Sequence, residues 1–289
     1  MLTTDWHFHS RNSCDCKDGA IRTTMAETFA AIQAKGVTDV GLTDHLHTPV
    51  NLPDLESSRR EFDALPPDPR RHFGVELSCV SAWELQEIAR GAVGKPVYGL
   101  RSGGPAKCEI VLGMEADDVA RLGVEYVVGG THWPLYVPVE RESVIRDYHR
   151  QNMLLAVHAL VTIVAHPWWW MGGWQEADGN YRTDPWLDDF RKVPSSMHDE
   201  FAAAVRECGK VVEINLCAML LNQSYPQRFK EQYVEYLAGL KAAGVALSLG
   251  SDHHAQHHGY AEIDHTGAES MLAAVGIMDR DLWRLPPRV

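Results

Sequence analysis

Long apolar runs are absent from the sequence, and no stretch approaches the roughly 20 residues that a membrane-spanning helix needs. Residues 1–5 lack a basic segment followed by an apolar core, so no signal peptide is expected. The six cysteines are scattered along 289 residues and do not form the framework of a disulfide-stabilised secreted protein. We therefore expect a cytoplasmic protein without a membrane anchor.

Basic residues are also scarce. Lys and Arg total 27 against 39 Asp and Glu, and the formal net charge is −12. No run of Lys and Arg is longer than a pair such as Arg59-Arg60. Because an acidic surface repels a nucleic-acid polymer, this composition favours a small substrate. The sequence leaves the oligomeric state open.

Short β-rich runs alternate with longer helical patterns. The expected strands are 3–9, 37–43, 72–78, 125–130, 161–166, 210–215 and 245–250. The expected helices are 24–35, 56–65, 140–160, 197–208, 227–243 and 266–275, three of which are followed by the glycines Gly36, Gly209 and Gly244. This alternation predicts parallel βαβ units and a distorted (β/α)7 TIM-like barrel, formed as a single domain over residues 1–289.

Residues 80–118 do not follow this alternation. The segment contains Gly103-Gly104-Pro105 and a possible extra strand at 109–112. We interpret it as an insertion or lid. The alternative is an eighth strand, which would give an ordinary eightfold barrel.

Histidine is abundant, with 15 residues, and many lie where a predicted strand ends. Barrel enzymes build active sites from the carboxyl ends of their strands. The metal-competent residues at these ends are His7, His9, Asp44, His45, Glu76, His132, His166, Glu213, Asn215, Asp252 and His254. Their concentration at successive strand ends predicts a metal site there.

The spacing of His7 and His9 follows from strand geometry. Alternate residues of a strand point to the same face, so both imidazoles share one face and Phe8 points away. Asp252 and His254 repeat this spacing. Imidazoles and carboxylates together suit zinc, iron or manganese.

The combined motifs resemble the polymerase and histidinol phosphatase (PHP) family. They are DWHFHS at 5–10 with Asp15, GLTDH at 41–45, GVELS at 74–78, GGTHW at 129–133, AHP at 165–167, EIN at 213–215 and GSDHH at 250–254. They run from residue 5 to residue 254, so the resemblance covers nearly the whole chain. It implies a distorted sevenfold barrel that binds three divalent metal ions.

The resemblance also implies a ligand for each ion. The first ion would be held by His7, His9, Glu76 and Asp252. The second would be held by Glu76, His132 and His166, with Glu76 bridging the two ions. The third would be held by Asp15, His45 and His254.

Two positions of this set need comment. Family members often have His where this chain has Asp15, and a carboxylate there favours manganese or iron over zinc. Glu115, in the GMEAD run at 113–117, is the alternative to Glu76 as the bridging carboxylate. We prefer Glu76 because it ends the third predicted strand.

The implied activity is hydrolysis of a phosphate monoester by a hydroxide held between two metal ions. The candidate catalytic residues are Asp44, Asp252 and His254, and Asp44 is expected to orient a ligand histidine through a hydrogen bond. The expected substrate is a small phosphorylated molecule, such as histidinol phosphate, a nucleotide or a sugar phosphate. The general acid is not identified.

Loop residues should select the substrate. Trp168, Trp169, Trp170 and Trp174 follow His166 closely and could stack on a ring or pack the barrel rim. The basic residues that could reach a phosphate are Arg11, Lys17, Arg101, Lys107 and Arg182.

Two other classes of protein remain as alternatives. An amidohydrolase or a barrel-type metal-dependent deoxyribonuclease also begins with His-x-His, but neither explains the Asp44-His45 and Asp252-x-His254 pairs. A non-catalytic metal-binding barrel would bind metal without turnover.

Overall fold

The computed structural model describes residues 1–16, 23–91, 98–100, 103–138, 140–170, 174–175, 181–182, 189–254 and 259–286, with the backbone alone at 174–175 and 181–182. Within these residues, no helix combines the length and the apolar character that crossing a membrane would require.

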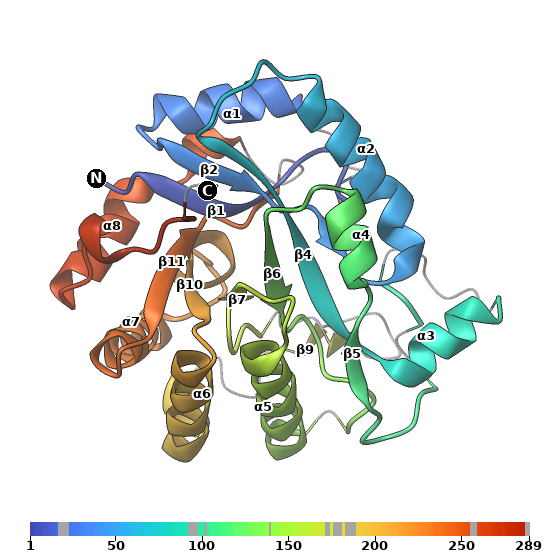
Figure 1. Ribbon diagram of the computed structural model, residues 1–289. Coiled ribbons are helices and arrows are strands. Elements are labelled where there is room, and N and C mark those ends of the chain that lie inside the picture. The colour runs from blue at the N-terminus through green and yellow to red at the C-terminus, as the bar shows by residue number, and fades with distance from the viewer. Residues whose placement is uncertain are drawn as a thin grey trace.

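A curled sheet lies at the centre of the molecule (Figure 1). Its main strands are all parallel and are ordered β11-β10-β7-β6-β4-β2-β1. Their bounds are β1 Thr4–His9, β2 Asp39–Leu42, β4 Arg71–Ser81, β6 Tyr126–Gly130, β7 Ile163–Ala165, β10 Val211–Asn215 and β11 Ala246–Gly250. Two short parallel strands, β3 (His45–Leu46) and β12 (His253–His254), pair with β4 and β1 respectively.

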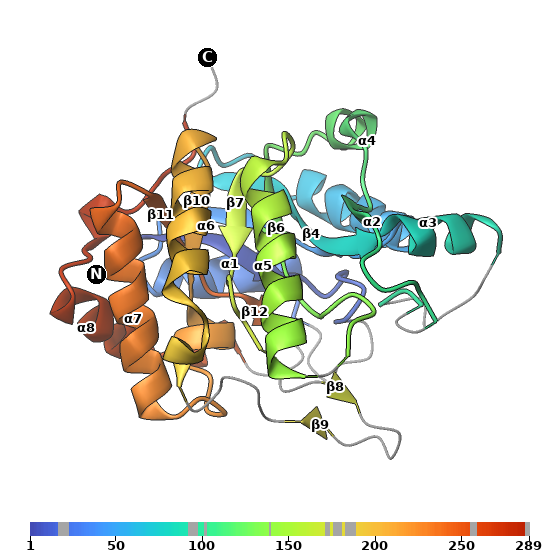
Figure 2. The same ribbon diagram turned by 90° about the horizontal axis from the view of Figure 1, so that it is seen from below.

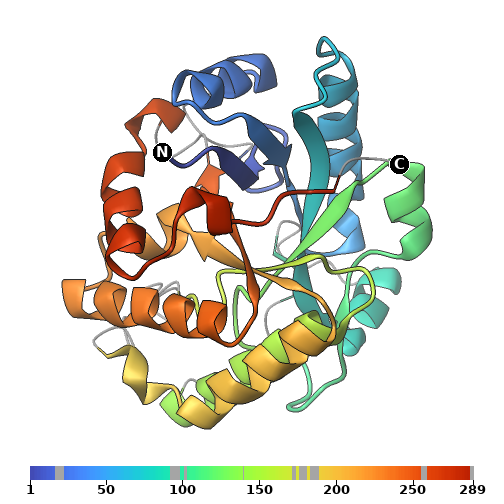
Figure 3. The same ribbon diagram turned by 60° about the vertical axis from the view of Figure 1, so that its left-hand side comes forward.

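Helices cover the outer face of this sheet (Figures 1 and 3). They are α1 Met25–Ala34, α2 Leu52–Asp63, α3 Ala82–Ala89, α4 Ala116–Arg121, α5 Arg141–Val157, α6 Ser195–Glu207, α7 Gln227–Ala242 and α8 His265–Ala274. In α7 the buried residues Phe229, Tyr233 and Leu237 recur every four residues and form the stripe that packs inward. The fold is therefore an α/β fold with a parallel sheet and outer helices.

Helix ends follow the glycine signals. Gly36 and Gly244 come directly after the capping residues of α1 and α7 and have φ of 84° and 83°. Glycine adopts this left-handed conformation without the strain that a side chain would add. The expected ends of these helices are confirmed.

Residues 80–118 are not a simple insertion, because part of the segment continues the central sheet. β4 was expected to end at Ser78, but it continues to Ser81 because its last residues pair with β5 (Ile110–Leu112). That pairing is antiparallel, so the strand expected at 109–112 exists but is not an eighth parallel strand. Helix α3 and the start of α4 also lie in this segment.

Short elements complete the chain. A two-stranded hairpin, β8 (Trp174–Gln175) and β9 (Tyr181–Arg182), lies beyond the end of the sheet where β12 lies (Figure 2). Single turns of 3-10 helix occupy Pro49–Asn51, Phe190–Lys192, Tyr260–Glu262 and Asp279–Asp281, and a π-helical turn occupies Leu216–Leu220.

An aromatic cluster fills the sheet interior near the amino ends of the strands. Trp6 packs edge-on against Tyr126 and Trp283, with ring centroids 5.7 Å and 5.4 Å away. Gly41 and Gly74 leave the room that the Tyr126 ring occupies, since a Cβ at either would lie under 3.0 Å from it. The Trp6 indole donates a hydrogen bond to the carbonyl of Trp283, and the amide of Trp283 donates one to Leu247 of β11. The C-terminal segment thus holds β1 and β11 together at this end.

We expect Trp6→Ala to lower the free energy of unfolding by about 3–5 kcal/mol, because it leaves a large cavity in this cluster. Urea unfolding at a fixed zinc concentration measures the change. Val157→Ala, at an exposed position on α5, is the control and should stay within about 0.5 kcal/mol of the parent. A loss under about 1 kcal/mol for Trp6→Ala would show that the cluster does not support the sheet.

Candidate metal centre

The carboxyl ends of the parallel strands bring the expected ligands into one buried group. His7 and His9 lie on β1, His45 on β3, Glu76 on β4 and His254 on β12. The others lie in the loops that follow β1, β6, β7 and β11. We call the whole set the central cluster: His7, His9, Asp15, His45, Glu76, His132, His166, Asp252 and His254. Asp15 and His254 are partly exposed, and the others are buried.

Glu76 lies at the middle of the central cluster. Its Oε1 is 3.1 Å from Nε2 of His132 and 3.1 Å from Nε2 of His166. Its Oε2 is 3.1 Å from Nε2 of His7 and 2.8 Å from Nδ1 of His45. The two carboxylate oxygens therefore face different sets of imidazoles, as a bridging carboxylate does.

A second carboxylate lies beside the β1 histidines. Nε2 of His7 and Nε2 of His9 are 3.1 Å apart. Oδ1 of Asp252 is 3.2 Å from Nε2 of His9 and 3.6 Å from Nε2 of His7. With Glu76 Oε2, these atoms surround one point.

A third group lies toward the rim of the site. Oδ2 of Asp15 is 2.9 Å from Nε2 of His254 and 3.4 Å from Nε2 of His45. The two imidazole nitrogens are 3.3 Å apart. The members of each of the three groups that the resemblance implies thus lie close to one another, and His45 approaches both Glu76 and Asp15.

The ligand atoms of the cluster fit divalent cations, because some of them do not satisfy one another by hydrogen bonding. Glu76 Oε2 and His132 Nε2 are buried and, in the described part of the chain, have no hydrogen bond of acceptable geometry, although imidazole or carboxylate atoms lie close by. A buried polar atom without a partner is costly. Ligand atoms converge within 4.8 Å of one another in the sets His7, His9, Glu76; His45, Glu76, His132; and His9, His45, His254. The residues present therefore fit bound metal.

Electrostatics keep the cluster carboxylates ionised. Burial alone would raise the pKa of Glu76, but His7, His45 and His132 lower it well below its ordinary value. Burial would likewise raise the pKa of Asp252, but His7 and His9 lower it well below its ordinary value. Ionised carboxylates are the form that binds a cation.

The histidines differ among themselves. Burial would lower the pKa of His7, but the neighbouring carboxylates of Glu213 and Glu76 raise it well above its ordinary value. Burial would likewise lower the pKa of His45, but Glu76 and Asp15 raise it well above its ordinary value.

Burial lowers the pKa of His132 to about 4 despite the opposing effect of Glu76. Burial also lowers the pKa of His9 well below its ordinary value, and the neighbouring His254 and His45 lower it further. Neutral imidazole is the form that binds a metal ion.

Glu213 and Asn215 support the cluster from β10. Glu213 Oε1 lies 2.6 Å from Nδ1 of His7, and its Oε2 accepts a hydrogen bond from the backbone amide of His166. Asn215 donates to Glu213 and to Oδ2 of Asp252. A carboxylate on the second nitrogen of a ligand histidine fixes the ring orientation. Sequence reasoning placed both residues at a strand end but did not find these contacts.

Two cluster residues have strained backbones. His166 and Asp252 have φ of 27° and 53°, a region that residues with a side chain rarely adopt. The amide of Asp252 donates a hydrogen bond to the carbonyl of His7, and that of His166 donates to Glu213. Such strain is often found at functional sites, where the surrounding structure maintains it.

The hydrogen bonds of Asp44 lie beside the central cluster. Its carboxylate accepts hydrogen bonds from the amide and hydroxyl of Ser10 and from the hydroxyl of Ser58, and among the described residues none of its hydrogen bonds comes from a cluster imidazole. It therefore joins the β1 loop to α2. Glu115 is exposed at the residue before α4 and lies outside the central cluster, in contrast to Glu76.

Trp169 contacts two histidines of the cluster. Its ring centroid lies 5.0 Å from that of His166 and 5.9 Å from that of His132. Trp168 and Trp170 are buried in the hydrophobic core. The packing interpretation therefore applies to Trp168 and Trp170, and stacking of Trp169 on a substrate ring stays a prediction.

Two of the basic residues that were expected to reach a phosphate, Arg11 and Lys107, have described side chains. Arg11 pairs with Glu61. Lys107 is exposed with φ of 57°. Lys17 and Arg101 lie outside the described residues, as do the side chains of Arg182 and Trp174.

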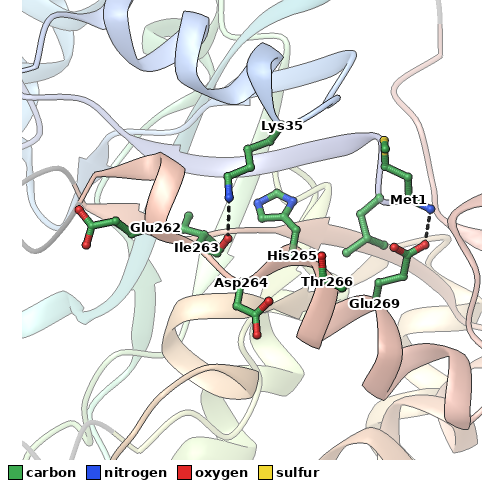
Figure 4. Close-up of a pocket in the computed structure, with 9 residues that line it drawn as sticks. Met1, Lys35, Glu262, Ile263, Asp264, His265, Thr266 and Glu269 are labelled. Atoms are coloured by element: carbon green, nitrogen blue, oxygen red, sulfur yellow. Dashed lines mark hydrogen bonds and ion pairs between the residues drawn. The ribbon is translucent and has the colours of Figure 1, made fainter.

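A separate cavity of about 370 Å³ lies between the N-terminal segment, α1 and α8 (Figure 4). Lys35 crosses it and donates a hydrogen bond to the carbonyl of Ile263. None of its lining residues belongs to the central cluster.

The curled parallel sheet with outer helices is a TIM-barrel-like arrangement. The chain is similar in fold to a histidinol phosphate phosphatase from Lactococcus lactis, solved with zinc, L-histidinol and phosphate, at a TM-score of 0.58 and 16% identity over 95% of this chain and 94% of that one. An amidohydrolase from Burkholderia multivorans with bound zinc gives 0.43 and 13% identity over 98% and 96%. The first likeness establishes the fold alone, and the second does not establish even that.

Comparisons based on the sequence found no relative of this chain. No protein-family model matches the chain, and no match was found among curated proteins.

A substitution at Gly130 tests the geometry of the cluster. A Cβ at Gly130 would lie 2.6 Å from Glu76 Oε1, 2.6 Å from Cε1 of His132 and 3.0 Å from Cε1 of His166. We expect Gly130→Ala to displace these side chains and to lower zinc affinity at least about 10-fold, as measured by competition with a chelating dye. The control is Gly239→Ala, where a Cβ meets nothing within 4 Å. Equal zinc affinity in both variants would contradict the geometry.

Proposed function

We propose that the protein is a metal-dependent phosphoesterase that hydrolyses a small-molecule phosphate monoester. The single observation that carries this proposal is Glu76, a fully buried carboxylate whose two oxygens face separate sets of imidazoles at the carboxyl end of a parallel sheet. A buried carboxylate in this environment would bridge two cations. The proposal includes a distorted (β/α)7 barrel of one domain.

Three ions fit the three groups. His7, His9, Glu76 and Asp252 would hold the first ion. Glu76, His132 and His166 would hold the second. Asp15, His45 and His254 would hold the third, and the carboxylate of Asp15 makes manganese and iron candidates beside zinc.

Bound divalent ions supply hydroxide at neutral pH and neutralise charge on a phosphoryl group. Other residues of the protein hold the ligand side chains in position. Glu213 holds the ring of His7, and Asn215 holds the carboxylate of Asp252. We assign Asp252 and His254 to the catalytic site because both lie at the boundary between the first and third groups. Oδ1 of Asp252 is 3.5 Å from Nδ1 of His254. Asp44 remains a structural residue in this proposal.

The third group separates this proposal from an amidohydrolase or a barrel-type deoxyribonuclease. Those classes need no ligands equivalent to Asp15, His45 and His254. Here Asp15 is held by both imidazoles, and its pKa is lowered well below its ordinary value by His45 and His254, although burial opposes this. A site for three cations suits a substrate that brings two negative charges, as a phosphate monoester does.

An aromatic rim supports the proposed substrate class. The ring centroids of Trp133 and Trp169 lie 5.4 Å and 5.9 Å from that of His132, and Tyr98 packs on Trp133. Flat apolar surfaces beside the cations suit an alcohol that carries a ring. Histidinol phosphate is the first candidate to test, followed by nucleotides and sugar phosphates.

We expect His132→Ala and Asp252→Ala each to lower hydrolysis of p-nitrophenyl phosphate at least about 100-fold, because loss of a ligand exceeds the 10–100-fold cost of losing a supporting contact. Circular dichroism should show a folded protein in both cases. His158→Ala, at the end of α5 away from the cluster, is the matched control. Turnover at the parent rate in either cluster variant would rule out the proposed site.

Metal removal gives a second test. Treatment with a chelator should abolish hydrolysis, and addition of manganese, iron or zinc should restore it. The assay is turnover before and after dialysis against each metal. An enzyme that stays fully active in excess chelator would refute a metal-dependent mechanism.

A further inference from the structure

His47 and Ser78 form a polar chain that ends on the central cluster. Nδ1 of His47 lies 2.6 Å from the hydroxyl oxygen of Ser78, and that oxygen lies 2.9 Å from Nδ1 of His132. His47 and Ser78 are 1% and 0% exposed. No solvent therefore reaches this chain, and its hydrogen bonds must be made within it.

The ring of His47 is held firmly in place. It stacks on His45, with centroids 4.5 Å apart, and it packs against Trp133 at 5.2 Å. The backbone amide of His47 donates a hydrogen bond to the side chain of Asn51. A ring packed against two other rings can hold Ser78 in one orientation.

The direction of the hydrogen bonds follows from counting protons. A neutral imidazole that binds a metal ion through Nε2 carries its proton on Nδ1. His132 would then donate from Nδ1 to the oxygen of Ser78. The hydroxyl of Ser78 has one proton, and its remaining neighbour is Nδ1 of His47. Ser78 therefore donates to His47, whose own proton must lie on Nε2.

We propose that Ser78 and His47 are positioning residues that orient His132 for metal binding, in a chain that runs from His132 through Ser78 to His47. The proposal rests on the metal role of the central cluster. It explains why a buried histidine that no ion group includes lies so close to that cluster. It also places the proton of His47 on Nε2.

If the hydrogen bonds of this chain ran in the opposite direction, His132 could not bind a metal ion. If His47 donated from Nδ1 and Ser78 donated to His132, the proton of neutral His132 would lie on Nε2, the atom that faces Glu76. That nitrogen could not then bind a cation. The tautomer of His132 is thus coupled to that of His47 through one hydroxyl group.

Zinc affinity tests the chain directly. Ser78→Ala removes the hydroxyl, and His47→Phe keeps a stacked ring but removes Nδ1. Each should weaken zinc binding about 10–100-fold in a chelator competition, the usual cost of losing a contact that orients a ligand. Ser248→Ala is the matched control, since Ser248 is also a buried strand serine but has no hydrogen-bond partner among the described residues. It should bind zinc as the parent does.

Rescue separates positioning from packing. The amide of Asn can place an acceptor oxygen near the position of Nδ1 in His, so His47→Asn should bind zinc more tightly than His47→Phe. In the zinc-loaded parent, the ¹⁵N spectrum should show His47 protonated at Nε2 and unprotonated at Nδ1. Parent-like zinc affinity in folded Ser78→Ala, or a proton on Nδ1 of His47, would overturn the proposal.

These measurements are independent of the substrate. If the parent binds zinc but hydrolyses no phosphate ester, the proposed function fails and the chain can still be tested. If Ser78→Ala and His47→Phe bind zinc as the parent does, the chain fails whatever the substrate is.

Discussion

The rest of the structure depends on the burial of Glu76 among imidazoles. Ionised carboxylates are rarely fully buried unless they are paired or coordinate a metal ion. Here the surrounding histidines favour the ionised form, yet their nitrogens approach Glu76 without making a full set of hydrogen bonds. Cations placed between these atoms would satisfy both partners at once.

The sheet supplies this arrangement through its register. His45 pairs with Glu76 across β3 and β4, and His9 pairs with His254 across β1 and β12. These pairings place residues that are up to 245 positions apart in the chain within contact of each other. At the opposite end, the Trp6 cluster fills the interior and links β1 to the C-terminal segment. One end of the sheet is thus packed with rings, while the other end is lined with ligands.

Local patterns predicted much of this arrangement. The alternation of His7 and His9 about Phe8 placed both imidazoles on one face, because strand geometry has a period of two. Contacts between distant segments were harder to predict. The hydrogen bond from Ser58 of α2 to Asp44 was not predicted, and the contact of Glu213 with His7 joins two strands that are far apart in the sequence. The antiparallel pairing of β5 likewise depends on tertiary contacts that no local period encodes.

The most direct test of the central claim is anomalous diffraction at the zinc edge from crystals of the zinc-reconstituted protein. We expect one anomalous peak within about 2–2.5 Å of each oxygen of Glu76, one of them beside His7 and His9 and the other beside His132 and His166. A third peak should lie between Asp15 and His254. Crystals of zinc-reconstituted protein with no peak at Glu76 would show that this carboxylate does not bind metal.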